Sequence, residues 1–128
     1  MNLLSVRVGT NDLAKARAFY DATFAALGFA VPAPVEGMPV AFYKLANANF
    51  VVGPARDGQP ATHSNGGTIL FGADDDAAVS AWHAAGLAHG GSSEGDPEPK
   101  PQARGAFGAY LRDPDGNKLG VFCGLKMG

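Results

Sequence analysis

Cysteine and charge are both scarce in this sequence, and each scarcity excludes a class of protein. Cys123 is the only cysteine, so no internal disulfide can form, and a lone thiol fits a reducing compartment. Charged residues make up 17% of the chain and the net charge is -2, so no basic surface for nucleic acid is expected. We also expect neither a membrane span nor a signal peptide, because apolar runs are short. A cytoplasmic protein is predicted.

The sequence also lacks the usual marks of several catalytic classes. No nucleophile–base pair, phosphate-binding loop or Cys-x-x-Cys motif is recognisable. The glycine pairs at 66–67 and 90–91 do not stand in the context that a phosphate loop requires.

What the sequence does contain is an internal repeat. The segment 9–28 matches the segment 72–91 without a gap at an offset of 63 positions. The coinciding residues include Gly9 with Gly72 and Asp12 with Asp75. Such a match indicates one structural unit that is used twice.

The first copy shows strand and helix patterns in turn. Apolar and polar residues alternate at its start, which predicts a strand whose polar face carries Ser5 and Arg7. Asn11 or Asp12 is expected to cap the helix that follows. In order, the expected elements are a strand at 4–9, a helix to about 27 and hairpin strands at 38–45 and 49–52.

The second copy repeats this order after a connector at 53–67 that is dense in turn residues. Its expected elements are a strand at 68–72, a helix from 74–76 to about 90, and a closing hairpin with strands at 106–112 and 118–123. The turn at 113–117 has the proline, glycine and asparagine that tight turns favour. The stretch 92–104 is polar and rich in proline, so we predict a mobile loop there.

Together these patterns predict an α+β fold in a single domain, residues 1–128. The first module covers about 1–57 and the second about 65–126, each with a strand, a helix and two or three further strands. Two such sheets side by side would leave the faces opposite the helices as a shared concavity. The residues expected to face it are Ser5, Arg7, Thr68, Leu70 and Gly120.

Several motifs together resemble a known family. They are Asn11–Leu13, Ala18–Tyr20, Gly53–Pro60, Ala81–Ala85 and Asp113–Leu119, and they span practically the whole chain. They are similar to the motifs of the glyoxalase/bleomycin resistance protein/extradiol dioxygenase superfamily, also called the vicinal oxygen chelate superfamily. The resemblance implies two βαβββ modules, the glyoxalase/bleomycin resistance/dihydroxybiphenyl dioxygenase-like fold, which form a cleft or half-barrel. It also implies a homodimer.

Enzymes of this family usually hold a divalent metal through His or Gln and Glu ligands, which come from the first and last strands of each module. The matching positions here are Ser5, Thr68 and Gly120, and the fourth falls between Asn49 and Val52. A catalytic metal needs about three imidazole, carboxylate or thiolate ligands, which hydroxyls and a glycine do not replace. We therefore expect no metal and no other cofactor.

Polar candidates for a binding site lie on the predicted strands and in the connector. Arg7 could bind a carboxylate or phosphate, or it could pair with an acidic residue at the strand edge. Ser5 and Thr68 could make further polar contacts. His63 could be a ligand contact or a general base, or an exposed loop histidine. We interpret His83 as structural.

Aromatic residues of the strands form a second group of candidates. Tyr43, Phe107 and Tyr110 could line the cleft and stack on a substrate, although core packing is the alternative for each of them. Trp82 and Phe19 are expected in the core. In the predicted loop, the polar residues that could close over an anionic ligand are Lys100, Gln102 and Arg104.

The sequence thus predicts a metal-free protein that binds a small molecule between its modules, with an anion as the leading candidate, similar to the antibiotic-sequestering members of the family. The alternative is a lyase, isomerase or dioxygenase that holds its metal through unusual ligands such as His63. If the protein is an enzyme, the resemblance implies a lactoylglutathione lyase-like lyase or a dioxygenase. Pairing of the modules within one chain and domain-swapped pairing in a dimer are both compatible with the sequence.

Overall fold

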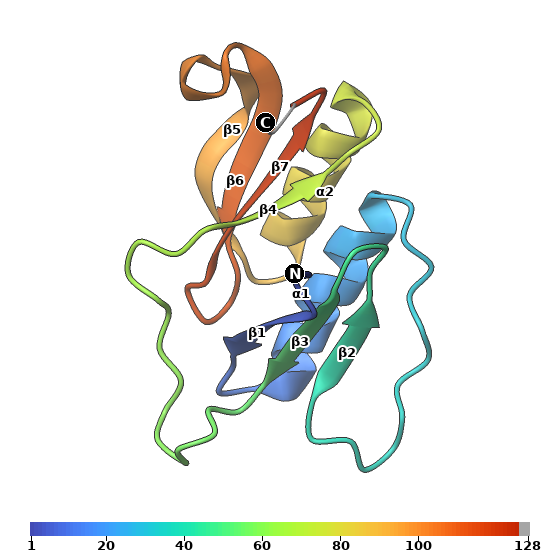
Figure 1. The fold of residues 1–128 in the computed structure, drawn as a ribbon, viewed down its shortest axis with the longest axis vertical. Helices are drawn as coiled ribbons and strands as arrows, with labels where there is room; N and C mark the ends of the chain where they lie inside the picture. Colours follow the sequence, from blue (N-terminus) through green and yellow to red (C-terminus); the bar gives the residue numbers. More distant parts are fainter. Residues whose placement is uncertain (126–128) are drawn as a thin grey trace.

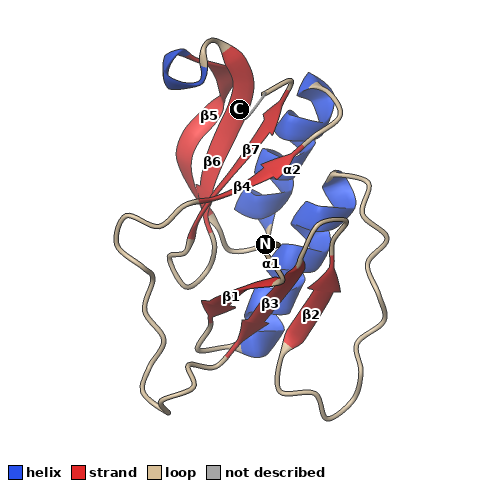
Figure 2. Ribbon diagram, in the orientation of Figure 1, coloured by secondary structure: helices blue, strands red, loops and turns tan. Residues whose placement is uncertain are grey.

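The chain forms two open sheets, and each sheet is covered by one helix (Figure 1). This computed structural model describes residues 1–125. Both helices lie behind the sheets in the view of Figure 2, so the opposite faces of the sheets point the same way. The elements are β1 (Ser5–Gly9), α1 (Leu13–Ala26), β2 (Ala41–Lys44), β3 (Asn49–Gly53), β4 (Ile69–Gly72), α2 (Asp76–Ala88), β5 (Ser92–Lys100), the short 3-10 helix η1 (Pro101–Ala103), β6 (Ala106–Arg112) and β7 (Lys118–Cys123).

The repeat is visible in the pairing of the strands. The first sheet has the order β1-β3-β2 and the second the order β4-β7-β6-β5. In each module the first strand runs parallel to the last one, and Val6 pairs with Phe50 as Ile69 pairs with Leu119. Residues that are 63 positions apart in the sequence thus occupy equivalent places in the two sheets.

The helix caps repeat as well. The carboxylate of Asp12 accepts a hydrogen bond from the backbone N of Lys15 at 3.1 Å, and that of Asp75 accepts one from Ala78 at 2.8 Å. Each bond satisfies a backbone donor that the first turn of a helix leaves free. Both helices therefore begin where the sequence predicted.

The α+β fold is confirmed, but the first module carries two strands after its helix where the second carries three. Residues 27–40, which separate α1 from β2, form no strand in the described structure. Pro32, Pro34 and Pro39 lie in this stretch, and proline lacks the N–H that a sheet ladder needs. The first sheet is correspondingly smaller.

The prediction of a mobile loop at 92–104 is wrong, because residues 92–100 form β5 and residues 101–103 form η1. β5 is an edge strand that pairs with β6 alone, and Pro99 lies opposite Phe107. Proline is tolerated at a sheet edge, where its missing N–H faces solvent. Pro97 falls within a shift of register between Gly95 and Glu98.

The core lies between the sheets and the two helices, which contact each other. Phe19 and Trp82 are fully buried, as predicted. The ring of Phe24 meets those of Tyr43 and Phe71 at centroid distances of 4.9 and 5.2 Å, which joins the first module to β4. Both modules thus share one core.

The turn between β6 and β7 also ties the modules together. The buried carboxylate of Asp113 accepts hydrogen bonds from Tyr20 Oη at 2.5 Å and from Asn117 Nδ2 at 2.8 Å. Asn117 Nδ2 also donates to the carbonyl of Gly9 at 3.0 Å, and Asp115 Oδ1 accepts from the backbone N of Asn11 at 2.9 Å. The motifs at Asn11–Leu13, Ala18–Tyr20 and Asp113–Leu119 therefore meet at a joint between the modules.

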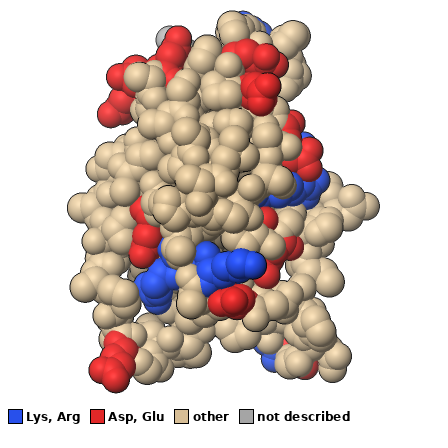
Figure 3. All heavy atoms as spheres, turned by 180° about the vertical axis from the view of Figure 1, so that it is seen from behind, with Lys and Arg blue, Asp and Glu red and all other residues tan. Residues whose placement is uncertain are grey.

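Charges are scattered over the helix side. Figure 3 shows the molecule from the helix side, with acidic and basic side chains in small separate groups among uncharged residues. Within residues 1–125, neither helix is long and apolar enough to cross a membrane.

Candidate functional site

The open face of a sheet, the face opposite its helix, is where a ligand can approach. Paired residues on neighbouring strands point to the same side of a sheet, so the register identifies which residues share this face. On the first sheet, Arg7 pairs with Val51, which pairs with Phe42. The exposure of Arg7 and Phe42 places this row on the open face, together with the row of Ser5, Asn49 and Lys44.

On the second sheet the equivalent row consists of Leu70, Gly120 and Tyr110. Leu70 is 41% exposed, which confirms that the row lies on the open face. Lys118 lies two residues before Gly120 on β7 and therefore has the same orientation. Thr68 is related to Leu70 in the same way.

A hollow of about 490 Å³ opens on this face of the second sheet, and we call it the polar hollow. It brings together two of the predicted site residues, Thr68 and Tyr110, and three residues of the stretch predicted to be a loop, Glu94, Lys100 and Gln102. The remaining residues of its lining are Leu70 and Lys118.

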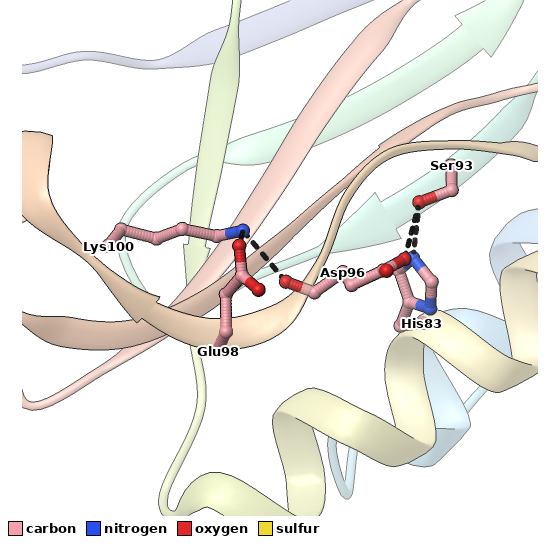
Figure 4. A network of polar contacts seen from close by, with 5 residues as sticks. All are labelled: His83, Ser93, Asp96, Glu98 and Lys100. Carbon is pink, nitrogen blue, oxygen red and sulfur yellow. Dashed lines mark hydrogen bonds and ion pairs between the residues drawn. The ribbon is translucent and has the colours of Figure 1, made fainter.

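Lys100 is the most buried charge of the polar hollow, at 5% exposure. Its Nζ donates to the backbone carbonyl of Asp96 at 2.7 Å and to Glu98 Oε1 at 3.2 Å. Figure 4 shows the ammonium group held between these two residues of its own strand. Burial of a charge is costly unless it is paired, and these contacts offset that cost.

The other charges leave one cation in excess. Arg112 Nε donates to Glu94 Oε1 at 2.5 Å, and this bond and the positive charge of Arg112 lower the pKa of Glu94. Lys118 forms no ion pair with any side chain of residues 1–125, and its Nζ lies 5.2 Å from the centre of the Tyr110 ring. The Nζ of Lys100 lies 6.0 Å from the same centre. Two ammonium groups thus flank one aromatic ring.

Behind β5, His83 of α2 anchors the strand. His83 Nε2 lies 2.9 Å from Ser93 Oγ, which in turn donates to Asp96 Oδ1 at 3.3 Å (Figure 4). Burial lowers the pKa of His83. In a nucleophilic triad the carboxylate orients the histidine and the histidine accepts the serine proton, whereas here the serine proton is turned to the carboxylate. The cluster therefore holds β5 in place, which agrees with the structural role predicted for His83.

The four positions that match the family's metal ligands do not fit a metal. Val51 pairs with Arg7 in the first sheet, and Gly120 pairs with Leu70 in the second. Because Arg7 and Leu70 are equivalent in the repeat, Val51 is the equivalent of Gly120 and therefore the fourth position, which the sequence left open. A Cβ atom added at Gly120 would lie 2.6 Å from a methyl carbon of Leu70 and 2.8 Å from the Tyr110 ring, so these side chains fill the ligand's space. Residues 1–125 contain no group of three or more His, Cys, Asp or Glu side chains that could hold a metal.

Arg7 and His63 lie outside the polar hollow. Arg7 Nη2 donates to the carbonyl of Pro54 at 2.8 Å, and it lines a separate hollow of about 320 Å³ against the connector. His63 is exposed and lies beside Gly116 in the β6–β7 turn. Ser5 is exposed on β1 and lines neither hollow.

Tyr43 and Phe107 point to the helix side of their sheets. Tyr43 is 1% exposed, and its hydroxyl donates to Asp21 Oδ1 at 2.7 Å. Burial and this hydrogen bond raise the pKa of Tyr43. Phe107 alternates in step with the buried Ala109 and packs against the core. Of the three predicted aromatic residues, the structure places only Tyr110 on the open face.

An apolar cleft of about 460 Å³ lies between the modules, next to the polar hollow. Its walls come from the start of β1, the end of α1, the β2–β3 turn and β4. They include Phe24, Phe29, Phe50 and Phe71, and Leu70 borders both the cleft and the polar hollow. A ligand on the open face would therefore meet charge on one side of Leu70 and apolar carbon on the other.

Sequence reasoning missed Lys118 and Glu94. Lys118 stands on a predicted strand two residues before Gly120, a residue that was expected to face the concavity, so the alternation of the strand could have identified it. Glu94 offered no such signal, because it lies in the stretch that was predicted to be a loop.

Comparisons with known proteins support the assignment of the fold. The family model described as "Glyoxalase/Bleomycin resistance protein/Dioxygenase superfamily" matches residues 2–121. A glyoxalase/bleomycin resistance protein from Albidiferax ferrireducens T118 is 37% identical, with a TM-score of 0.83 over 94% of this chain and 97% of that chain. A lactoylglutathione lyase from Agrobacterium tumefaciens is 26% identical, with a TM-score of 0.62 over 95% of this chain and 92% of that one. A glyoxalase-related enzyme from Fulvimarina pelagi is 18% identical, with a TM-score of 0.76 over 96% and 88% of the two chains. None of the curated proteins matches the sequence significantly.

Proposed function

The chain belongs to the glyoxalase/bleomycin resistance protein/dioxygenase superfamily, and from that premise we propose that it binds a small organic molecule on the open face of its sheets without a resident metal. One observation carries the proposal. The positions that match the family's metal ligands are Ser5, Val51, Thr68 and Gly120, and the space beside Gly120 is filled by Leu70 and Tyr110.

The residues at these positions do not provide a coordination sphere for a metal. They leave a surface that is suited to an organic molecule. The polar hollow offers the hydroxyl of Thr68, the amide of Gln102 and an aromatic ring, and the apolar cleft adjoins it across Leu70. Binding sites for small molecules commonly combine apolar walls with a few fixed polar groups. The proposal therefore centres on the second module and the boundary between the modules.

The first test is metal content. Purified protein is incubated with Zn²⁺, Ni²⁺, Mn²⁺ or Fe²⁺ in turn, freed of loose metal and analysed, and we expect far less than one equivalent of each. One tightly held equivalent that disappears in His63→Ala but persists in His89→Ala would contradict the proposal. His89 is a matched control because it is also exposed, and its Nδ1 lies 2.8 Å from the carbonyl of Ala85.

The second test is a thermal-shift screen of small organic molecules. Hits that bind the open face of the second sheet should lose most of their shift in Tyr110→Leu and keep it in Phe42→Leu. Phe42 is the equivalent exposed aromatic residue on the open face of the first sheet. Comparison of the two variants therefore separates the effect of position from the effect of losing an aromatic ring. Hits that respond only to Phe42→Leu would move the site to the first module.

A metal-dependent lyase, isomerase or dioxygenase remains the second candidate. The similarity to the lactoylglutathione lyase from Agrobacterium tumefaciens, at 26% identity, favours it. For this candidate His63 would have to act with ligands from outside the positions that the family uses. The metal analysis described above distinguishes it from the first proposal.

We further propose that the protein is a homodimer, as the resemblance implies, and that it is cytoplasmic, as its composition predicts. Light scattering coupled to size-exclusion chromatography should give about twice the chain mass of 13.1 kDa. A mass of one chain over the whole concentration range would contradict the dimer without affecting the binding proposal.

A further inference from the structure

We propose that the polar hollow selects an organic monocarboxylate with a planar apolar body, and that Lys118, rather than Arg7, binds its charge. This inference rests on the proposed function and adds the chemical class of the ligand and its orientation.

The charges around the hollow do not balance. Lys100, Lys118 and Glu94 are the charged residues that line the hollow, which leaves one positive charge in excess. Lys100 pairs with Glu98 and Glu94 with Arg112, whereas Lys118 forms no ion pair within residues 1–125. A single excess positive charge in a concave surface attracts an anion of single charge. A dianion would retain one uncompensated charge there.

The position of the excess charge is restricted. The Tyr110 ring lies 5.2 Å from Lys118 Nζ, and β6, which carries this ring, lies between β7 and β5. Lys100 approaches the same ring from β5, and two of its three donor hydrogens are used by Asp96 and Glu98. A carboxylate beside Lys118 is therefore also within the field of Lys100.

The walls of the hollow suit a ligand with a planar apolar body. Gly120 has no side chain, so the Tyr110 ring and Leu70 lie over the backbone of β7, where a larger residue would have stood. These two side chains are the aromatic and aliphatic walls of the hollow, and Leu70 leads to the apolar cleft. A planar apolar group can stack on the ring while its carboxylate reaches Lys118.

Arg7 does not offer the same combination. Its guanidinium group already donates to the carbonyl of Pro54, and the hollow that it lines against the connector contains Arg56 and Asp57 but no aromatic residue. The anion that the sequence placed at Arg7 is therefore assigned to the second module.

Three probes of matched shape test this assignment on the full-length protein by isothermal titration or by NMR chemical-shift mapping. Benzoate has both the ring and the charge, benzamide has the ring alone, and acetate has the charge alone. We expect benzoate to bind at least about tenfold more tightly than either of the others, because each of them lacks one of the two contacts; a tenfold difference corresponds to about 1.4 kcal/mol. Equal affinity of benzamide and benzoate would overturn the charge assignment.

Two lysine variants identify the partner. Lys118→Met keeps the apolar stem, and it should weaken benzoate binding about tenfold or more and leave the residual benzamide affinity within about twofold. Lys44→Met is the matched control, because Lys44 is exposed on the open face of the first sheet, and it should change neither. Loss of benzoate binding in Arg7→Ala with no change in Lys118→Met would refute the inference.

The failures of the two proposals can be told apart. If neutral screen hits bind through Tyr110 while benzoate does not bind, the inference fails and the proposed function stands. If a metal equivalent is found and benzoate binds only in its presence, the proposed function fails, and the inference fails with it. Unfolding curves of each variant confirm that a loss of binding is not a loss of fold.

Discussion

On the first sheet, the row across the open face runs from Arg7 through Val51 to Phe42, and on the second sheet the equivalent row runs from Leu70 through Gly120 to Tyr110. The first two positions differ in chemistry, and the third is aromatic in both rows. The first row carries a charge at the edge strand and a branched residue in the centre, whereas the second carries an aliphatic edge and an empty centre that an aromatic ring covers.

The helix sides of the same two sheets are far more alike. Val6 corresponds to Ile69, Phe50 to Leu119, and the two helix caps are both aspartates. Residues of a packed core must fit their neighbours, so substitutions there are restricted to similar shapes. The difference between the two sides indicates that packing restricts the residues on the helix sides of both sheets, whereas the open faces of the two copies are free to differ.

The largest expected effect is at the joint between the modules, where the two copies depend on each other. Asp113→Ala removes the acceptor of the Tyr20 hydroxyl, of the Asn117 amide and of two backbone N–H groups in its turn. Because buried donors without partners are costly, we expect the free energy of unfolding to fall by about 3 kcal/mol or more, measured by urea denaturation.

Asp115→Ala is the matched control for this change, because Asp115 lies in the same turn and its carboxylate accepts one bond, from the backbone of Asn11. A loss of about 1 kcal/mol is expected for it. If the two variants lose equal stability, the turn does not hold the modules together in the way that the contacts of Asp113 indicate.

The next effect concerns the empty centre of the second row. In Gly120→Ala the new methyl group would meet Leu70 and Tyr110 at less than 3 Å, so overpacking should cost about 1–3 kcal/mol of unfolding free energy. Gly72→Ala, on β4 of the same sheet, meets no atom within 4 Å, and stability should stay constant or rise by up to about 1 kcal/mol.

This pair of variants also bears on binding. Displacement of the Tyr110 ring in Gly120→Ala should weaken the binding of benzoate, whereas Gly72→Ala should leave its affinity unchanged. A Gly120→Ala protein of unchanged stability and unchanged affinity would show that Tyr110 and Leu70 move aside freely, and the centre of the second row would then resemble that of the first.

The parts of the fold that could be predicted are those that local patterns determine. Both helices follow from apolar residues spaced three or four apart after an aspartate cap, and the closing hairpin follows from its turn residues. β5 was missed because Pro97 and Pro99 favour a loop locally. Only the tertiary position of the strand at a sheet edge makes them compatible with pairing.

The candidate site was less predictable, since it depends on which face of a strand a side chain occupies. Tyr43 and Phe107 stand one residue out of step with the open face, and a shift of one residue moves a side chain to the other side of a sheet. The strand at 38–45 was predicted with the right type but without a fixed register, so the orientation of Tyr43 could not be derived. Pairing of charges such as Arg112 with Glu94 depends on β5 and was equally inaccessible.

The smallest effect separates two tyrosines that the sequence grouped together. Tyr43→Phe removes the hydrogen bond to Asp21 and should lower the free energy of unfolding by about 1 kcal/mol at neutral pH, with no change in benzoate affinity. Burial and Asp21 raise the pKa of Tyr43 in the folded protein, so its contribution is complete below the unfolded pKa of about 10 and decreases as the pH rises above it. The stability difference between the native protein and Tyr43→Phe should therefore shrink above about pH 10. Urea denaturation at neutral and alkaline pH measures it, and a weaker affinity for benzoate in Tyr43→Phe would place Tyr43 in contact with the open face after all.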